Sequence, residues 1–163
     1  MKTKFKIKGF LPLLLSILLT TITVFYAIDL FTNSIDQDKI FVRLILLIFL
    51  LLTLTWLVLG EVKNKFIIVE FSDDKISVAK MGGLLPTKEF NPTKVEGWKH
   101  SILASKGGDD EYLYLYLDGK KIIKISEFYH KNYSEIKKYV KSRYKNLGFE
   151  EFSYLDELKE MFE

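Results

Sequence analysis

EYLYLYLDGKKIIKIS, residues 111–126, is the clearest indication of β-structure in the second half of the chain. Leucine and tyrosine alternate through its first half without a slip, and this two-residue period is typical of a β-strand with unlike faces. Asp118-Gly119 is a strong signal for a two-residue hairpin turn, and a second β-rich run follows it. The stretch therefore predicts an antiparallel hairpin with one leucine face and one tyrosine face. The leucines are Leu113, Leu115 and Leu117, and the tyrosines are Tyr112, Tyr114 and Tyr116.

Upstream of this hairpin, the same pattern predicts more short strands. Residues 66–71 (FIIVEF) and 75–80 (KISVAK) are β-rich, and Asp73-Asp74 between them is typical of a turn. Gly82-Gly83 then interrupts the chain, and residues 85–99 contain two further short strands punctuated by prolines. Together with the two strands of the hairpin, these runs predict about six or seven antiparallel strands.

A single helix is predicted after the strands. Asn132 can cap its first turn, with Glu135 three residues later in a capping-box arrangement, and Gly148 supplies a stop. Apolar residues keep helical spacing along one side, and lysines occupy the opposite side. The apolar residues are Tyr133, Ile136, Val140, Tyr144 and Leu147, and the lysines are Lys137, Lys138, Lys141 and Lys145.

The tail, residues 149–163, has the pattern of a short acidic amphipathic helix with Ser153 as a cap. Because an acidic helix is repelled by anionic lipid, its apolar stripe is expected either on the chain's own domain or in a groove on a partner. The basic face of residues 137–145 lies just upstream, so docking on the chain's own domain closes only a short loop and is favoured.

Two long apolar segments precede all of these elements. Residues 10–31 contain a single charge, Asp29, and as a helix they reach about 33 Å, which exceeds a hydrocarbon core of about 30 Å. Residues 40–59 form the second segment, with Arg43 one turn from its start, where a long side chain reaches the headgroups. A secretory signal peptide is the competing interpretation of the first segment, but it would have a shorter apolar core and a small-residue cleavage site.

The lysines that flank these segments predict their orientation. Four lysines precede the first segment and two follow the second, whereas the connection at residues 32–39 offers one lysine and two aspartates. The positive-inside rule therefore predicts an integral protein of a bacterial cytoplasmic membrane with both termini in the cytoplasm. The expected parts are a basic N-terminus (1–9), a transmembrane hairpin (10–60, with spans 10–31 and 40–59), a domain (61–148) and the acidic tail (149–163).

GKKIIKISEFYHKNYSEIKKYVKSRY, residues 119–144, is similar to the last strand and helix of bacterial pleckstrin-homology-like (PH-like) domains. Such domains commonly follow two transmembrane helices in small bacterial membrane proteins. The resemblance implies an α+β fold, a small antiparallel β-barrel or sandwich closed by a C-terminal helix, and a membrane-anchored binding or assembly module without established chemistry. Eukaryotic PH domains that bind phosphoinositides have a pattern of basic residues across their first hairpin, whereas this chain has Ser72-Asp73-Asp74 at the corresponding place.

Composition and motifs point away from catalysis. The chain has no cysteine, which excludes disulfides, thiolate metal sites and cysteine nucleophiles. Residues 61–163 carry equal numbers of basic and acidic side chains, which argues against non-specific nucleic-acid binding. His100 and His130 are the only histidines, and neither has a carboxylate at catalytic or zinc-binding spacing. The sequence predicts no enzyme, no catalytic residue, no cofactor, no metal and no nucleic-acid partner.

One short motif does resemble an enzyme signature. Gly107-Gly108-Asp109-Asp110 is close to the Gly-Gly-Asp-Glu-Phe motif of diguanylate cyclases, which hold a metal and a nucleotide on a hairpin. Diguanylate cyclase domains have a longer α/β fold with helices before the motif, whereas strands are expected before the motif in this chain. The motif is therefore interpreted as a hairpin loop whose glycines allow positive φ, and a nucleotide cyclase is kept as a remote alternative.

Two surfaces are candidates for interaction with a protein partner or a second copy of the chain. One is the tyrosine face of the hairpin (Tyr112, Tyr114 and Tyr116), because aromatic side chains are common interface anchors. The other is the lysine face of the predicted helix (Lys137, Lys138, Lys141 and Lys145). The function expected is a non-enzymatic interaction or assembly module at the cytoplasmic face. The alternative is a domain that senses membrane state, a small ligand or a lipid, which an apolar pocket between strands and helix would favour.

Overall fold

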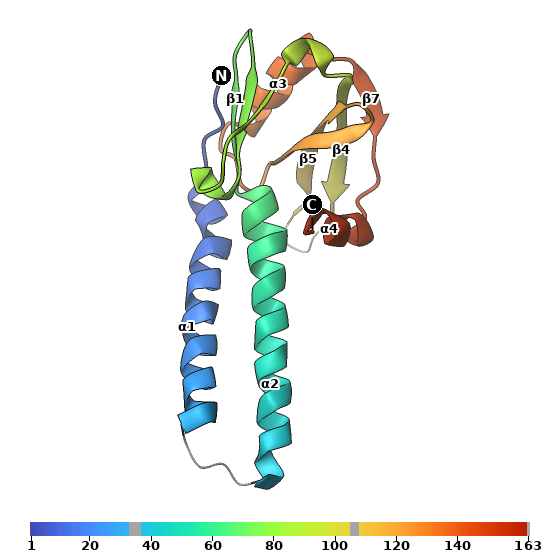
Figure 1. Ribbon diagram of the computed structural model, residues 1–163. Helices are drawn as coiled ribbons and strands as arrows, with labels where there is room; N and C mark the ends of the chain where they lie inside the picture. Colours follow the sequence, from blue (N-terminus) through green and yellow to red (C-terminus); the bar gives the residue numbers. More distant parts are fainter. Residues whose placement is uncertain (33–36, 105–107, 163) are drawn as a thin grey trace.

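A computed structural model describes residues 1–32, 37–104 and 108–162. Two long helices run side by side (Figure 1): α1 (Leu11–Thr32), preceded by the 3-10 turn η1 (Ile7–Phe10), and α2 (Gln37–Thr55), which continues as the π-helical segment η2 (Trp56–Lys63). With these extensions, Ile7–Thr32 and Lys39–Lys63 are both long and apolar enough to cross a membrane. The two predicted apolar segments are therefore helices of spanning length.

The rest of the chain forms two separate sheets. The first contains β1 (Ile68–Phe71), β2 (Ile76–Ala79) and β3 (Lys88–Phe90) in the order β1-β2-β3, with antiparallel pairing. The second contains β4 (Gly97–Leu103), β5 (Asp110–Leu117), β6 (Lys120–Ser126) and β7 (Asn146–Phe149) in the order β6-β5-β4-β7. Short 3-10 turns, η3 (Met81–Gly83) and η4 (Pro92–Lys94), lie on either side of β3. The described residues form an α+β arrangement in which the sheets do not close into a barrel.

The predicted hairpin is confirmed. β5 and β6 pair antiparallel, and Asp118 and Gly119 between them both have positive φ, at 51° and 68°. Two successive positive φ values are the geometry of a type I′ turn, which matches the right-handed twist of the flanking strands. Leu113 and Leu115 lie in the main apolar core, while the tyrosines form a cluster of their own.

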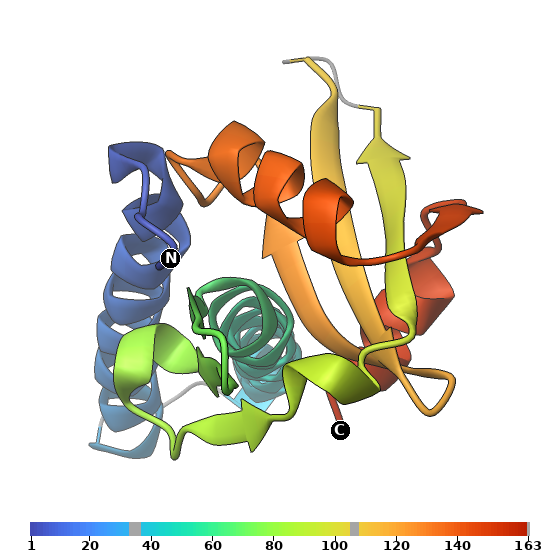
Figure 2. The ribbon, with the colours of Figure 1, turned by 90° about the horizontal axis from the view of Figure 1, so that it is seen from above.

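The main core lies between the two sheets and helix α3 (Tyr133–Arg143). Leu113 and Ile125 from the four-stranded sheet, Ile76 from the other sheet, and Ile136 and Val140 from α3 are all fully buried. The helix crosses the four-stranded sheet in Figure 2. The predicted apolar side of this helix is therefore correct for its first turns.

The predicted end of the helix is wrong, because α3 stops at Arg143 and the chain enters strand β7. This strand pairs parallel with β4, so one of the seven strands breaks the expected antiparallel pattern. Gly97 makes the close approach possible, since a Cβ built there would lie 2.3 Å from the Lys145 carbonyl oxygen. Gly148, expected as the helix stop, instead lies inside β7 with a φ of 102°.

Asn132 does not cap α3 through its side chain. Its Oδ1 accepts a hydrogen bond from the Lys4 backbone nitrogen at 2.8 Å, and its Nδ2 donates to the Lys2 carbonyl oxygen at 2.9 Å. The N-terminal residues also follow β1, where the Thr3 nitrogen donates to the Val69 oxygen and Thr3 Oγ1 accepts from the Val69 nitrogen, both at 2.9 Å. The basic N-terminus is therefore packed against the domain before α1 begins.

Candidate functional site: the tyrosine face and the tail

The tyrosine face is covered rather than open. Tyr112, Tyr114 and Tyr116 point away from the main core, yet each is at most 8% exposed. Leu103, Leu147 and the tail residue Phe152 pack against them, and the Phe152 and Tyr112 ring centroids are 5.7 Å apart. Both faces of β5 are therefore buried, one against the main apolar core and the other beneath the tail.

Lysine ammonium groups lie over the tyrosine rings. The distance from Nζ to ring centroid is 4.0 Å for Lys121 and Tyr114, and 4.9 Å for Lys99 and Tyr116. The ring of Tyr112 has two such neighbours, Lys124 at 5.3 Å and Lys65 at 5.7 Å. These distances are within the range in which a cation is attracted by the face of an aromatic ring.

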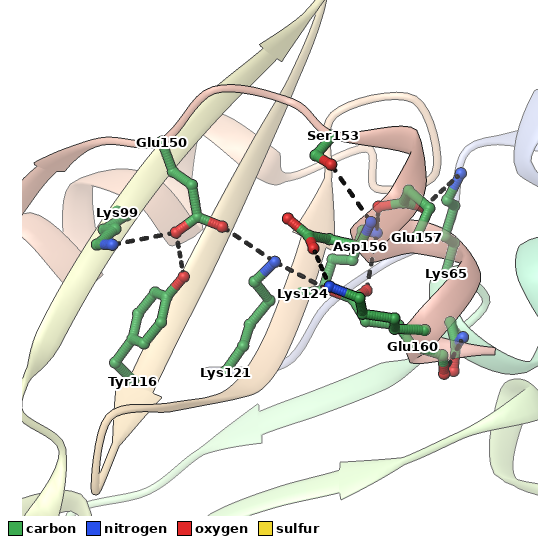
Figure 3. Close-up of polar contacts among 12 residues, drawn as sticks. Lys65, Lys99, Tyr116, Lys121, Lys124, Glu150, Ser153, Asp156, Glu157 and Glu160 are labelled. Atoms are coloured by element: carbon green, nitrogen blue, oxygen red, sulfur yellow. Dashed lines mark hydrogen bonds and ion pairs between the residues drawn. The ribbon is translucent and has the colours of Figure 1, made fainter. Parts of the chain in front are cut away.

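The tail helix α4 (Tyr154–Glu160) supplies the carboxylates that pair with these lysines (Figure 3). Glu160 lies 2.8 Å from Lys121 and 3.2 Å from Lys124, while Glu157 contacts Lys124 and lies 3.3 Å from Lys65. Residues just before the helix extend the network, since Glu150 accepts from the Tyr116 hydroxyl and pairs with Lys99 and Lys121, both at 3.1 Å. Ser153 caps the helix, as predicted, by accepting from the Asp156 nitrogen at 3.3 Å. The tail is docked on the chain's own domain, as favoured, but on the tyrosine face instead of the basic side of α3.

The same network reaches the end of the second long helix. Glu61 pairs with Lys65 at 2.6 Å and accepts from the Tyr129 hydroxyl at 2.8 Å. Lys63 donates to the Met161 carbonyl oxygen at 3.1 Å, and Asn64 donates to the Glu160 carbonyl oxygen at 2.9 Å. The C-terminal end of α4 is therefore fastened to η2 as well as to the sheet.

The pKa shifts of this face favour tight binding of the tail. Burial raises the pKa of Tyr112 and of Tyr114, so both phenols stay neutral at ordinary pH. Burial by itself raises the pKa of Glu160, but the ion pairs with Lys124 and Lys121 outweigh it, and the pKa of this carboxyl lies below its ordinary value. Burial likewise opposes the charge on Lys65, but the neighbouring carboxylates of Glu61 and Glu157 outweigh it, and the net effect raises its pKa. The face combines neutral phenols with ion pairs, an arrangement suited to holding a segment in place.

Three of the four predicted lysines, Lys137, Lys138 and Lys141, lie on α3, which packs on the other side of the four-stranded sheet from the tyrosines. Lys145 lies after the end of the helix at Arg143. Lys137 is engaged by Glu111, whose Oε2 is 2.6 Å away, and the Lys141 ammonium lies 5.6 Å from the Trp98 ring. Lys138 and Lys145 are exposed and have no ion pair with any residue that the structure describes. The two predicted surfaces are therefore separate, and whether either binds a partner stays a prediction.

The residues that sequence reasoning missed are the ones that join the tail to the sheet. Lys121 and Lys124 looked like ordinary strand lysines, and Lys65 looked like a membrane-flanking charge. The available signal was the acidity of the tail, set against a domain (61–148) in which basic residues outnumber acidic ones. The sequence does not say which of the many lysines provide it.

Gly108 and Asp109 of the Gly-Gly-Asp-Asp motif lie between β4 and β5, as the loop interpretation predicts. Gly107 is outside the described residues, Gly108 has a φ of 117°, Asp109 is exposed, and Asp110 begins β5. Within the described ranges, no group of three His, Asp or Glu side chains is close enough to hold a metal ion.

The two histidines differ in their surroundings. His130 is fully buried, and its ring nitrogens lie 3.0 Å from the carbonyl oxygens of Ser126 and Ile67. Burial lowers the pKa of His130, although both carbonyls oppose that effect. His100 packs its ring against Phe149, with the centroids 5.4 Å apart. Both contacts are structural.

A groove of about 1060 Å³ lies between the two sheets, beside the tail. Its apolar floor includes Leu85, Pro86, Phe90 and Ile122. Two carboxylates, Asp156 and Glu160, also line it. Its six lysines are Lys63, Lys80, Lys88, Lys120, Lys121 and Lys159. The groove is therefore amphipathic, with a strong excess of positive charge.

Comparison of the chain with protein-family models, with curated proteins and with solved structures found no match. These comparisons identify no family for the chain.

Proposed function

We propose that this chain is a membrane-anchored, non-enzymatic interaction module of the bacterial cytoplasmic membrane, with both termini and the α+β domain on the cytoplasmic face. Two helices of spanning length support the anchor. Lysines before the first helix and after the second, compared with the short connection between them, support the orientation through the positive-inside rule.

The observation that carries the proposal is that the domain is fastened to both long helices. Residues 2–5, which lead into α1, bond to β1 and to Asn132, and the end of η2 bonds to the tail. A domain held at two separate points has a fixed orientation relative to the membrane. Such a platform suits the presentation of a defined surface to a partner.

The proposed fold family is the PH-like domain. Six antiparallel strands in two sheets, followed by α3 packed across the core, support it. The additional parallel strand β7 and the open groove between the sheets are features of this chain that the resemblance does not imply.

The exposed Lys138 of α3 and the exposed Lys145 just after this helix are the proposed contact with a partner or a second copy. The test is affinity purification of the full chain in mild detergent, with the mass of the complex measured by light scattering. We expect a stoichiometric partner or a homo-oligomer that is lost in the double variant K138E/K145E. The matched control K94E/K131E reverses two exposed lysines elsewhere and is expected to keep it. A strictly monomeric protein without any stoichiometric partner contradicts the proposal.

Orientation has its own test. A reporter that works only in the cytoplasm is expected to be active when fused after Glu163 and silent when fused at Asp36. The reverse pattern contradicts the proposed topology, whatever the outcome of the partner experiment.

The groove favours a second candidate function, the recognition of an anionic lipid. Lys88 and Lys120 line it and have no ion pair with any described residue, so their charge is available to a phosphate, while the apolar floor suits an acyl chain. Lys63, at the end of the second long helix, also lines the groove, which supports a position of the groove near the headgroups.

Native mass spectrometry tests this candidate with phosphatidylglycerol and phosphatidylcholine added to the purified chain. Retention of phosphatidylglycerol over phosphatidylcholine is expected, with a several-fold loss in K88Q/K120Q and none in K94Q/K131Q. Equal retention of both lipids, or equal retention by both variants, contradicts lipid recognition by the groove.

A further inference from the structure

The tail helix leaves an apolar side uncovered. Tyr154, Leu155 and Phe162 are each at least 70% exposed, and Leu158 is 46% exposed. At about 100° per residue Tyr154, Leu155 and Leu158 fall within one arc of roughly 100°, and Phe162 follows in the turn after the helix. Four large apolar side chains on a short segment form a coherent face, unlike the scattered exposed leucines that any surface carries.

The acidic side chains of the same helix are turned the other way. The Glu157 and Glu160 side chains are only 19% and 21% exposed, and both are paired with buried lysines of the sheet. Asp156 is paired with Lys159 at 3.3 Å. The repulsion expected between an acidic tail and anionic lipid is therefore largely removed, because the carboxylates that would cause it face the protein and are neutralised there.

The position of α4 brings this apolar face to the membrane boundary. Met161 packs beside Gly60, where a Cβ would lie 3.4 Å from the methionine sulfur, and Lys63 and Asn64 bond to the carbonyl oxygens of Met161 and Glu160. A hydrocarbon core of about 30 Å takes about 20 helical residues, so a span over residues 40–59 ends just before Gly60. Figure 1 shows α4 at the base of the sheets, beside the upper end of the second long helix.

We propose that α4 lies in the plane of the bilayer interface, with Tyr154, Leu155, Leu158 and Phe162 inserted at the boundary between headgroups and acyl chains. Interfacial helices bury their apolar face by about 5–10 Å at this boundary, and tyrosine is favoured there because its ring is amphipathic. The occupant of the apolar face is thus the membrane that the long helices cross. The inference rests on the proposed membrane insertion of those helices.

In this arrangement α4 has two unlike partners. Its acidic side closes the tyrosine face of the sheet, and its apolar side rests on lipid. The domain then meets the membrane surface at a third place, beside the points where residues 2–5 and η2 already hold it.

Because the chain has no cysteine, single nitroxide labels at introduced cysteines report their surroundings without background. The full chain is reconstituted in vesicles of phosphatidylethanolamine and phosphatidylglycerol, and each label's accessibility to oxygen and to a water-soluble nickel chelate is measured. Leu158→Cys tests the apolar face. Asp156→Cys is the matched control on the other side of the same helix, Leu52→Cys tests membrane insertion, and Asp74→Cys marks the distant β1–β2 turn.

The expected result is that the labels at positions 158 and 52 are several-fold more accessible to oxygen than to nickel, while those at 156 and 74 favour nickel. A label at 158 that favours nickel, with the label at 52 in lipid, overturns the interfacial helix and leaves the proposed function intact. A label at 158 shielded from both reagents means that protein covers this face, which also overturns the inference. A label at 52 that favours nickel overturns membrane insertion itself.

Discussion

The two faces of the four-stranded sheet are buried by different means. On one face, Leu113, Leu115, Ile123 and Ile125 pack against the other sheet and α3 in a cluster of buried apolar side chains. On the other face, tyrosines, lysines and tail glutamates form a network of rings and ion pairs. The same strand, β5, supplies alternate residues to both faces.

One strand with alternating residues therefore contributes to stability in two ways, through apolar packing on one face and through ion pairing on the other. Hydrocarbon packing depends on buried area and shape, and it is nearly independent of pH and salt. The stability of the ionic face depends on charge pairing and therefore on pH. The tail that covers this face is a short segment with few apolar contacts of its own. The apolar face is therefore expected to hold the domain together, and the ionic face to hold the tail in place.

The largest effect is expected on the apolar face. Leu115→Ala removes a fully buried side chain from the main core and should destabilise the domain by about 2–5 kcal/mol, because a cavity forms where packing was dense. Thermal unfolding of the full chain in detergent, followed by near-ultraviolet circular dichroism, measures this. Leu117→Ala, at the half-buried end of the same strand, is the control and should cost clearly less. Equal losses would show that the core is not centred where the structure places it.

A smaller effect is expected when the ionic face is uncovered. Deleting residues 150–163 removes Met161 and the three paired glutamates, and should cost about 1–2 kcal/mol, lowering the unfolding temperature by several degrees. The tyrosines should then become accessible to solvent, which ultraviolet difference spectroscopy detects. An unchanged unfolding temperature together with loss of a binding partner would instead identify the tail as an interaction motif.

Acid should release the tail before it affects the core. The pKa values of Glu160 and Glu150 are lowered in the folded state, although burial alone raises them. For Glu160 the cause is pairing with Lys124 and Lys121. For Glu150 the cause is the hydrogen bond from the Tyr116 hydroxyl together with pairing with Lys121 and Lys99. A carboxylate with a lowered pKa stabilises the docked state above its ordinary pKa of about 4.3, and this contribution is lost as the pH falls through its lower folded value. The mobility of a spin label at position 156 should therefore rise below about pH 4 and stay constant from pH 5 to 8.

Two variants separate this acid response from a general effect of low pH. Glu151→Gln changes an exposed carboxylate outside the described ion pairs and should leave the transition unchanged. Glu150→Gln/Glu160→Gln removes the two carboxylates whose pKa values are lowered and should give a mobile label already at pH 7. An acid transition that persists unchanged in the double variant would contradict the assignment.

The smallest effect concerns the cap of α4. Ser153→Ala removes the oxygen that accepts from the Asp156 nitrogen and should cost about 0.5–1 kcal/mol in the stability of the tail helix. Faster hydrogen exchange of the first-turn amides of α4, with unchanged exchange in β5, is the expected signature. Ser153→Asp, which keeps a capping oxygen, should restore slow exchange.

Local pattern made much of the fold predictable. The β5–β6 hairpin follows from alternation and from Asp118-Gly119, and the two long helices follow from apolar length, because each depends on neighbours in the sequence. The end of α3 was missed because Tyr144 and Leu147 keep helical spacing, yet Gly97 offers a distant backbone site where β7 pairs with β4. Tertiary contact overrode the local preference there.

The ionic face was only half predictable for the same reason. Sequence showed that the tail is acidic and amphipathic, but the pairing of Glu157 with Lys65 and of Glu160 with Lys121 joins residues about 40 to 90 positions apart. No short-range rule selects these lysines over those of α3. Asn132 was assigned to its own helix because a cap is a local role, whereas its side chain serves the N-terminal residues.

The bonds of Asn132 with the N-terminal residues set an order of events during synthesis. Lys2 and Lys4 are made before both long helices, but their partner Asn132 lies 130 and 128 positions later in the chain. The N-terminal segment must therefore wait, without its final partners, while both long helices and nearly all of the strands leave the ribosome. Its docking against β1 and Asn132 comes late in biogenesis, and until then the edge of β1 is open to pairing with other chains.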